Sequence, residues 1–469
     1  MAVHIKRQFS LKLFVLFSIK KVYRWRHVIM SLLLVALVLC FYIILIFGVP
    51  FEIKKSAPKP IKLEFINASD SASVKAFANK WVGFPHLSYI NCQEVLTYPI
   101  TNEAFEKTLH RIADSALAAE SSDCPSFRTK HGFHRFPNIT EEEREFPIAF
   151  IVLFHKDLDQ VLFLLRAIYR PHNVYCLSVD LNSGPTFIQH VRSVITCLPN
   201  VFLAKTLEPI VYAGFSRLMA DIHCMKELLT SPVNWRYLVN IPGQQFPLRT
   251  NLEMVKIFKI YNGANDQLGV SGKKSLPRRY KIKHHVVWDK KTGRNITAES
   301  VGRYPPPPHN FQIVKGSAYG TFSRAFVEFV MTDRRAHDLI EWSRGIESPD
   351  EYVWSTLHHT KIMKVPGGFT GDPESKRSMT TFVAWQREVP CESIHVRWIC
   401  IFSAADLPML KRRPELFANK FYIDLHPVAL HCLDQYIFNL TITNQVRDLQ
   451  LYRELPFILT NQRPTLMNT

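Results

Sequence analysis

The chain has 469 residues, 47% of them hydrophobic, which is enough apolar material for one large domain or two ordinary ones. The 12% share of aromatic residues excludes a disordered or fibrous chain, and a count of 17 glycines excludes collagen. A formal net charge of +18 would ordinarily suggest nucleic acid, an anionic membrane surface or a phosphorylated ligand. The positions of the basic residues decide between these meanings.

The amino terminus carries a concentrated part of this charge. Residues 1–27 hold seven basic side chains and no acidic one, and residues 28–50 then carry no charge at all. A helix over these 23 residues, at about 1.5 Å per residue, crosses roughly 30 Å of hydrocarbon. A cleaved signal peptide would have a shorter apolar region and a small-residue cleavage site, whereas this run ends in FGVPF. By the positive-inside rule we expect a cytosolic tail over 1–27, a transmembrane signal-anchor helix over 28–50 and a luminal remainder.

Two further patterns agree with a luminal or extracellular side. Acceptor patterns for N-glycosylation begin at Asn67, Asn138, Asn295 and Asn439. One of the nine cysteines, Cys40, lies in the predicted span, which leaves eight in a compartment that permits disulfides. No Cys/His spacing indicates zinc, so we expect a disulfide framework. Eight cysteines allow on the order of 100 pairings, and the sequence alone does not choose between them.

The luminal part begins with a polar, proline-broken stem over residues 51–88, followed by a domain over 89–440 and a carboxyl-terminal extension over 441–469. Apolar runs of strand length at 147–154 and 173–179 flank a helical pattern, which indicates a βαβ unit with a parallel sheet. The alternation then continues with further predicted elements: helices around 186–197 and 216–229, strands near 201–205 and 235–241, an exposed polyproline connection at 305–308, and a strand that turns at its glycines over 311–322. This pattern predicts an α/β fold with an open, mainly parallel sheet.

Polar side chains follow the first two predicted strands. His155 and Asp180 fall at the carboxyl ends of these strands, where open α/β sheets bind ligands, although each also fits an ordinary loop cap or turn residue. The Asp-x-Asp at 157–159 could chelate a metal on a diphosphate, but acidic residues at a helix start are typical caps, and we favour that interpretation. Without a metal, a diphosphate needs cationic side chains. A membrane-tethered luminal α/β domain is, by analogy, the architecture of many nucleotide-sugar-dependent glycosyltransferases.

Six collinear blocks resemble the core-2/I-branching β-1,6-N-acetylglucosaminyltransferases, and the similarity runs from about Asn91 to Asn439. The blocks are LLRAIYRPHNVYCLSVD (164–180), LEPIVYAGFSRLMADIHCMKEL (207–228), NWRYLVNIPGQQFPLRTNLEMV (234–255), ESPDEYVWSTL (347–357), VRWICIFSAADL (396–407) and LFANKFYIDL (416–425). The resemblance implies a GT-A-type nucleotide-sugar-binding fold. It also implies an inverting, metal-independent transfer of GlcNAc from UDP-GlcNAc to a 6-hydroxyl, with no cofactor.

The resemblance places functional roles on individual residues. Glu351 matches the family's catalytic base, and Arg397 and Lys420 match the cations that hold the diphosphate. His155 and Asp180 match positions on the nucleotide side, and Arg279 keeps an arginine on the acceptor side. Glu351, Arg397 and Lys420 also have purely structural interpretations. Ser348 to Glu351 has the spacing of a capping box, and Arg397 and Lys420 could be ordinary surface cations.

The cysteine spacing also fits the family framework. The resemblance implies the pairs Cys92–Cys432, Cys124–Cys197, Cys176–Cys224 and Cys391–Cys400. A bond across the last pair would restrain the loop that carries Arg397. Closing the loop between Cys92 and Cys432 could contribute about 4–5 kcal/mol in the chain-entropy model. The segment 263–283 departs from the family where acceptor contacts lie, and Lys273 and Lys274 are out of register with the family's acceptor lysine.

We therefore predict a type II Golgi β-1,6-N-acetylglucosaminyltransferase that branches O-glycans on GalNAc or on galactose. Its partners would be UDP-GlcNAc, an O-glycan or glycoprotein acceptor, and the membrane through one helix; a homodimer stays open. Two alternatives remain: a protein xylosyltransferase-like enzyme that uses UDP-xylose, and a catalytically silent, membrane-anchored glycan-binding protein. No nucleic acid partner is expected, because the domain is luminal and no basic-aromatic motif is present.

Overall fold

The computed structural model describes residues 87–99, 111–133, 139–375 and 377–461, which all fall in one compact unit spanning residues 67–469. The predicted tail, the 28–50 span and nearly all of the stem lie outside the described residues, as do Asn67 and Asn138. Within the described ranges, no helix combines the length and the apolar character needed to cross a bilayer.

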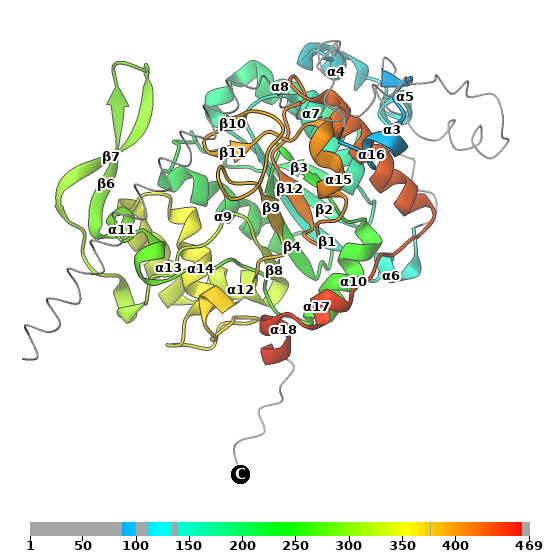
Figure 1. Cartoon of the computed structure of the whole chain (residues 1–469). Helices are drawn as coiled ribbons and strands as arrows, with labels where there is room; N and C mark the ends of the chain where they lie inside the picture. Colours follow the sequence, from blue (N-terminus) through cyan, green and yellow to red (C-terminus); the bar gives the residue numbers. More distant parts are fainter. Residues whose placement is uncertain (1–86, 100–110, 134–138, 376, 462–469) are drawn as a thin grey trace, which may run out of the picture. The chain divides into compact units, whose positions relative to one another are not determined.

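A five-stranded sheet with the order β3-β2-β1-β4-β8 forms the centre of this unit (Figure 1). Strands β1 to β4 pair in parallel, and β8 pairs antiparallel with β4 at the edge. The strands are β1 (Ile148–Phe154), β2 (Val174–Val179), β3 (Val201–Leu203), β4 (Tyr237–Pro242) and β8 (Thr321–Ser323). The predicted α/β class with a mainly parallel sheet is confirmed.

Helices cover both faces of the sheet, and the sequence of β1 shows why. Alternate residues of the strand point to opposite faces, and every residue of β1 is buried, so the strand is one continuous apolar run. Phe150 packs on one face of the sheet, in a first core cluster, and Ile151 packs on the other face, in a second cluster. The first cluster includes α7 (Leu158–Ile168), α8 (Pro185–Ile195) and α10 (Asn251–Tyr261). The second includes α9 (Phe215–Leu229), α12 (Arg324–Thr332), α13 (Arg334–Trp342) and α14 (Val353–His359).

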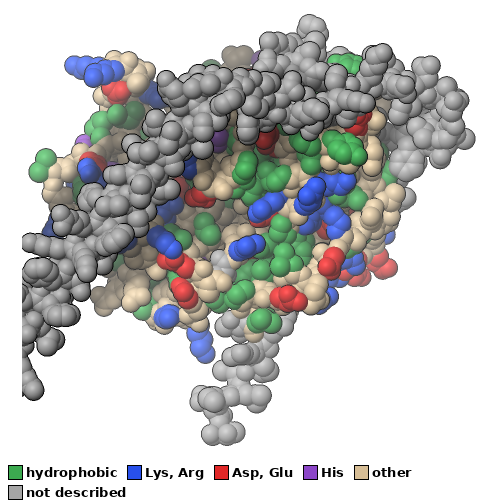
Figure 2. Space-filling model, in the orientation of Figure 1, with side chains coloured by type: hydrophobic (Ala, Val, Ile, Leu, Met, Phe, Trp, Pro, Cys, Tyr) green, Lys and Arg blue, Asp and Glu red, His purple; other side chains and the backbone are tan. Residues whose placement is uncertain are grey.

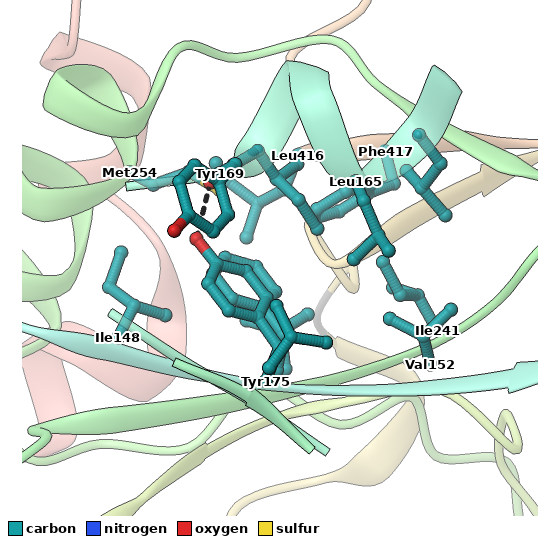
Figure 3. Close-up of a cluster of buried hydrophobic side chains, with 14 of the residues drawn as sticks. Ile148, Val152, Leu165, Tyr169, Tyr175, Ile241, Met254, Leu416 and Phe417 are labelled. Carbon is teal, nitrogen blue, oxygen red and sulfur yellow. Dashed lines mark hydrogen bonds between the residues drawn. The ribbon is translucent and has the colours of Figure 1, made fainter. Parts of the chain in front are cut away.

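Tyr175 shows how a buried polar group is accommodated in the first cluster (Figure 3). Its ring rises from β2 and stacks on Phe150 and Tyr169, with centroids 5.3 and 5.8 Å away. Its hydroxyl donates to the carbonyl of Ile168 at 2.7 Å and accepts from the N–H of Arg170 at 2.8 Å. Because both partners lie at the end of α7, the hydroxyl fixes where this helix ends relative to β2.

A smaller sheet and several short helices lie beside the central sheet. The three-stranded sheet has the order β5-β12-β9, with β5 (Gln245–Pro247), β12 (Phe417–Asn419) and β9 (Thr381–Val383). It shares a third apolar cluster with α3 (Cys92–Val95), α15 (Leu407–Leu410) and α16 (Pro427–Ile442). Two hairpins complete the strands: β6 (Ile282–Asp289) with β7 (Arg294–Arg303), and β10 (His395–Val396) with β11 (Ile399–Cys400).

The prediction of a strand over 311–322 is wrong for most of its length. Only β8 at its end is a strand, and before it Lys315 makes a single antiparallel bridge to Val270. A side chain at Gly316 would place its Cβ 1.8 Å from the Oγ of Ser355 and 2.2 Å from the carbonyl oxygen of Leu268. The backbone therefore bends to pack closely against α14, and this tertiary contact overrides the apolar pattern.

Beyond residue 440, the described chain up to residue 461 forms α17 (Gln450–Arg453) and α18 (Pro456–Asn461), and Tyr452 and Phe457 are buried in the same cluster as β1. The remaining short helices of the described part are α4 (Asp114–Glu120), α5 (Cys124–Lys130), α6 (Glu141–Arg144) and α11 (Arg278–Lys281).

Four disulfides cross-link the described chain. They pair Cys92 with Cys432, Cys124 with Cys197, Cys176 with Cys224 and Cys391 with Cys400, which are the pairs that the family resemblance implies. The first closes a sequence separation of 340 residues and ties α3 to α16.

The basic charge of the domain is dispersed on the face drawn in Figure 2. Lys and Arg side chains there are interspersed with Asp and Glu and do not gather into one continuous basic surface.

Candidate functional site

Arg397 lies at the tip of the β10–β11 hairpin. Arg397 and Trp398 form the two-residue turn, and both have positive φ values, 54° and 67°. Two-residue hairpin turns with φ positive at both positions favour Asn-Gly, because other side chains are strained there. The Cys391–Cys400 disulfide closes the base of this loop, as the family resemblance implies. The turn therefore holds an exposed guanidinium on a backbone conformation that Arg and Trp disfavour by themselves.

Lys420 directly follows β12 and lies against the same hairpin. Its carbonyl accepts from the N–H of Phe402 at 2.9 Å, and its own N–H donates to the carbonyl of Cys400 at 3.5 Å. Lys420 is only 6% exposed, and among the described residues its ammonium has no ion pair. Burial, and after it the charge of Arg397, lower the pKa of Lys420 to about 8. The two cations therefore lie close enough to influence each other, and within the described ranges neither forms an ion pair with a carboxylate.

Two tyrosine rings lie beside these two cations. The guanidinium carbon of Arg397 lies 4.2 Å from the centroid of the Tyr212 ring, which is 67% exposed. The Nζ atoms of Lys420 and Lys156 each lie 5.5 Å from the centroid of the Tyr422 ring. Cations over aromatic faces are stabilised and oriented, so Arg397 is restrained although it is exposed.

Asp180 and His155 lie where the sequence places them, after β2 and β1. The Oδ1 atom of Asp180 accepts from the N–H groups of Asn182 at 2.9 Å and Ile210 at 3.0 Å. Asp180 is thus a turn residue that fixes the segment leading to Tyr212. Desolvation lowers the pKa of His155, and the positive charge of Lys156 lowers it further, so His155 is neutral near pH 7.

Glu351 ends the short 3₁₀ helix η7 (Pro349–Glu351), and the capping-box interpretation of this block is wrong. Ser348 adopts a left-handed conformation with φ 54°, its side chain caps nothing, and its N–H donates to the carbonyl of Ala213 at 2.7 Å. The carboxylate of Glu351 instead accepts two cationic donors at Oε2: Nη1 of Arg279 at 3.0 Å and Nζ of Lys315 at 2.9 Å.

Arg279 connects the carboxylate to the rest of the site. Its Nε lies 3.5 Å from Glu347, so the guanidinium spans two carboxylates of one segment. Burial opposes its charge, but Glu351 and Glu347 raise the pKa of Arg279, and Tyr212 acts in the same direction. Tyr212 therefore lies near both Arg279 and Arg397.

The Asp-x-Asp at 157–159 has a structural partner in the described chain. Nη1 of Arg111 binds Asp157 at 2.6 Å, and Nη2 binds Asp159 at 2.5 Å. Lys156 also binds Asp157 at 2.9 Å. The expected capping by Asp157 is absent, because this residue stands at the start of α7 in a left-handed conformation without a side-chain cap. Its charge is neutralised by basic side chains instead.

Sequence reasoning missed three residues of this site. Lys315 and Tyr212 lie in irregular segments without periodicity, so only their contacts identify them. Asp350 is buried next to Glu351, and burial raises its pKa to about 6, although Arg217 at 3.9 Å opposes the rise. An acidic pair at 350–351 was the one available signal in the sequence. Across the described ranges, no group of three or more His, Cys, Asp or Glu side chains is placed to hold a metal ion.

An open α/β sheet, cations without described acidic partners and a carboxylate held near them suit a group-transfer enzyme that binds a diphosphate and deprotonates a hydroxyl. Comparison with known proteins defines this class further. Residues 148–411 match the Core-2/I-Branching enzyme family. The chain belongs to this family of glycosyltransferases.

Curated relatives cover most of the chain. The rat protein named beta-1,3-galactosyl-O-glycosyl-glycoprotein beta-1,6-N-acetylglucosaminyltransferase 3 is 35% identical, over 76% of this chain and 85% of its own length. The human protein of that name is 34% identical, over 79% and 87%, and the one from Bos taurus is 38% identical, over 67% and 72%. A solved structure, 4-diphosphocytidyl-2C-methyl-D-erythritolsynthase from Anaerococcus prevotii, aligns with 42% of this chain and 80% of its own at a TM-score of 0.23 and 10% identity.

Proposed function

We propose that this protein transfers GlcNAc from UDP-GlcNAc to the 6-hydroxyl of GalNAc or galactose in O-glycans and inverts the anomeric centre. The relatives act, by their names, as β-1,6-N-acetylglucosaminyltransferases on galactosyl-O-glycosyl glycoproteins. The observation that carries the proposal is the placement of Glu351, whose carboxylate is held by Arg279 and Lys315 and not by a helix cap.

Each group has a defined part in the proposed reaction. Glu351 accepts the proton of the acceptor hydroxyl, and the hydroxyl oxygen forms a bond to C1 of GlcNAc. The bond from C1 to the diphosphate oxygen breaks, and its electron pair leaves with UDP. Arg397 and Lys420 stabilise the charge that develops on the leaving group. His155 and Asp180 lie on the nucleotide side, and Arg279 lies on the acceptor side.

The transfer is proposed to proceed without a metal. Arg397 and Lys420 supply positive charge where a metal ion would otherwise bind the diphosphate. The carboxylates of Asp157 and Asp159 are occupied by Arg111, which supports a structural role for this pair. Excess EDTA is expected to leave the transfer rate unchanged, and loss of activity that a divalent ion restores would contradict this.

The proposed location is the Golgi membrane, in a single-pass type II orientation with residues 89–440 and the following segment in the lumen. The uncharged run at 28–50 and the basic residues before it support this topology. The eight paired cysteines support an oxidising compartment. Asn67, Asn138, Asn295 and Asn439 are the proposed N-glycosylation sites.

The function can be tested with the full-length protein in detergent. We expect transfer from UDP-GlcNAc, and none from UDP-xylose, to an O-glycan acceptor that contains galactose β-1,3-linked to GalNAc. Transfer from UDP-xylose alone would favour the xylosyltransferase alternative. Binding of the acceptor without transfer from either donor would favour a silent glycan-binding protein.

A further inference from the structure

Lys315 is a second cation on the carboxylate of Glu351. Its ammonium lies 2.9 Å from Oε2, and Nη1 of Arg279 lies 3.0 Å from the same oxygen. Within the described residues, the other oxygen of this carboxylate, Oε1, has neither a hydrogen bond nor an ion pair. Both cations therefore hold one oxygen and leave the other available.

The backbone fixes Lys315 in this position. The N–H of Gly316 donates to the carbonyl of Glu351 at 2.7 Å, so the two residues are joined by their main chains as well as by their charges. Lys315 and Val270 exchange two hydrogen bonds, at 3.0 and 2.7 Å. Val270 belongs to the segment 263–283, which departs from the family where acceptor contacts lie. The close packing of Gly316 against Ser355 leaves no room for this loop to shift inward.

We propose that Lys315 is a positioning residue for the transfer reaction, an inference that rests on the proposed role of Glu351 as the base. Together with Arg279 it anchors Oε2, so that Oε1 faces the acceptor hydroxyl and receives its proton. Lys315 thus supplies the acceptor-side lysine that the out-of-register Lys273 and Lys274 do not; Lys274 pairs with Glu374 on the surface instead.

The test compares Lys315→Met with Lys315→Arg in the full-length enzyme. Lys315→Met is expected to lower kcat about tenfold, the loss that one favourable charge contact would cause, and to leave the KM for UDP-GlcNAc unchanged. Lys315→Arg keeps the charge and should restore kcat.

A kcat in Lys315→Met equal to that of the unaltered enzyme would overturn the proposal, as would a Lys315→Arg enzyme that is equally impaired at an unaltered melting temperature. A transfer-active Glu351→Gln enzyme would instead overturn the role of the base itself, so the two failures are distinguishable.

The β6–β7 hairpin carries a second, independent feature. It stands apart from the central sheet (Figure 1) and exposes 62% of Trp288 and 50% of Val286. Trp288 pairs with Asn295, and Val286 pairs with Thr297, so these four side chains share one face of the hairpin. Asn295 and Thr297 are the ends of an N-glycosylation acceptor pattern.

We infer that an N-glycan on Asn295 covers this apolar face and packs its first sugars on the indole of Trp288. Directly opposed residues of an antiparallel pair have Cβ atoms about 4.5–5.5 Å apart, so the first sugar begins within contact of the ring. An exposed Trp next to an exposed Val is otherwise a liability for strand-edge association. The inference rests on the proposed luminal side of the domain.

A double-mutant cycle tests the contact in full-length protein made in cells that add N-glycans. Asn295→Gln should lower the melting temperature when Trp288 is present and change it little in a Trp288→Ala background. Asn439→Gln, which removes an acceptor on the exposed side of α16, should give the same effect in both backgrounds. Additive effects of the Asn295 and Trp288 substitutions, or an unmodified Asn295 in an enzyme that is glycosylated at Asn439, would overturn the inference and leave the transferase function standing.

Discussion

The proposed donor side and the proposed acceptor side of the site differ in how their charges are balanced. On the donor side, Arg397 and Lys420 approach each other, and the described residues offer Lys420 no acidic partner. On the acceptor side, Arg279 and Lys315 are paired with Glu351 and Glu347. The donor side therefore carries positive charge that an anion can neutralise. On the acceptor side, the charges of Arg279 and Lys315 are balanced by those of Glu351 and Glu347 without a ligand.

This difference matches the two substrates of the proposed reaction. A nucleoside diphosphate brings negative charge that two cations can stabilise, and the charge grows as the bond to the sugar breaks. A sugar hydroxyl is neutral and needs only an oriented base. The loops that carry the two sides meet at Tyr212, which contacts Arg397 and influences Arg279.

The largest expected effect comes from Glu351→Gln. This change keeps the shape of the side chain and removes the base, so kcat should fall about 10³-fold while UDP binds as before. Glu347→Gln is the matched control, because Glu347 also binds Arg279 but is not the proposed base; it should cost far less. Steady-state kinetics and UDP titration measure both, and equal losses in the two variants would contradict the distinction.

Removing the donor-side arginine should have the next largest effect. Arg397→Ala is expected to lower kcat/KM about 10²-fold, because one of two charges on the leaving group is lost. Arg335→Ala is a control on the surface, where this arginine binds Asp333 and lies in α13. Donor binding that is unaffected by Arg397→Ala would show that the hairpin does not hold the diphosphate.

The affinity for UDP should depend on pH through Lys420. Lysine binds an anion in its protonated form, and the pKa of Lys420 is about 8. Affinity should therefore be full below this pH and weaken as pH rises through it. Calorimetric titration with UDP over a range of about pH 6.5 to 9.5 measures the change in affinity. Lys420→Arg stays charged throughout and should flatten the curve; the same decline in both enzymes would contradict this cause.

The smallest expected effect comes from Arg111→Ala. Arg111 is partly exposed, so loss of its bonds to Asp157 and Asp159 should destabilise the fold by about 1 kcal/mol or less. Thermal unfolding measures this. If the donor side uses cations alone, the variant should remain active in EDTA. Activation of the variant by Mn²⁺ would show instead that the two aspartates can serve a metal once they are released.

The central sheet could be predicted from the sequence because its apolar runs are long and bounded by polar residues. The predicted strand at 147–154 differs from β1 by one residue, and the positions of His155 and Asp180 follow from it. The segment 311–322 could not be predicted, since Gly316 bends it against Ser355 through a tertiary contact. The roles of Glu351 and Arg397 came from the family resemblance, because spacing alone favoured a helix cap for Glu351.

Lys315 and Tyr212 could not be identified from the sequence for a different reason. Each lies far along the chain from its partner in the site, and neither falls in a periodic segment. Lys315 reaches Glu351 only because Gly316 and Val270 hold its loop. Tyr212 reaches Arg397 because Asp180 fixes the preceding segment through Ile210. Such contacts follow from packing and leave no local pattern.

The proposed reaction, in which Glu351 deprotonates a 6-hydroxyl while Arg397 and Lys420 hold the departing UDP, is tested by linkage analysis of the product made from UDP-GlcNAc and an O-glycan acceptor in excess EDTA. We expect a β-1,6-linked GlcNAc from the unaltered enzyme and almost none from Glu351→Gln. A product with another linkage, or an equal yield from Glu351→Gln, would contradict it.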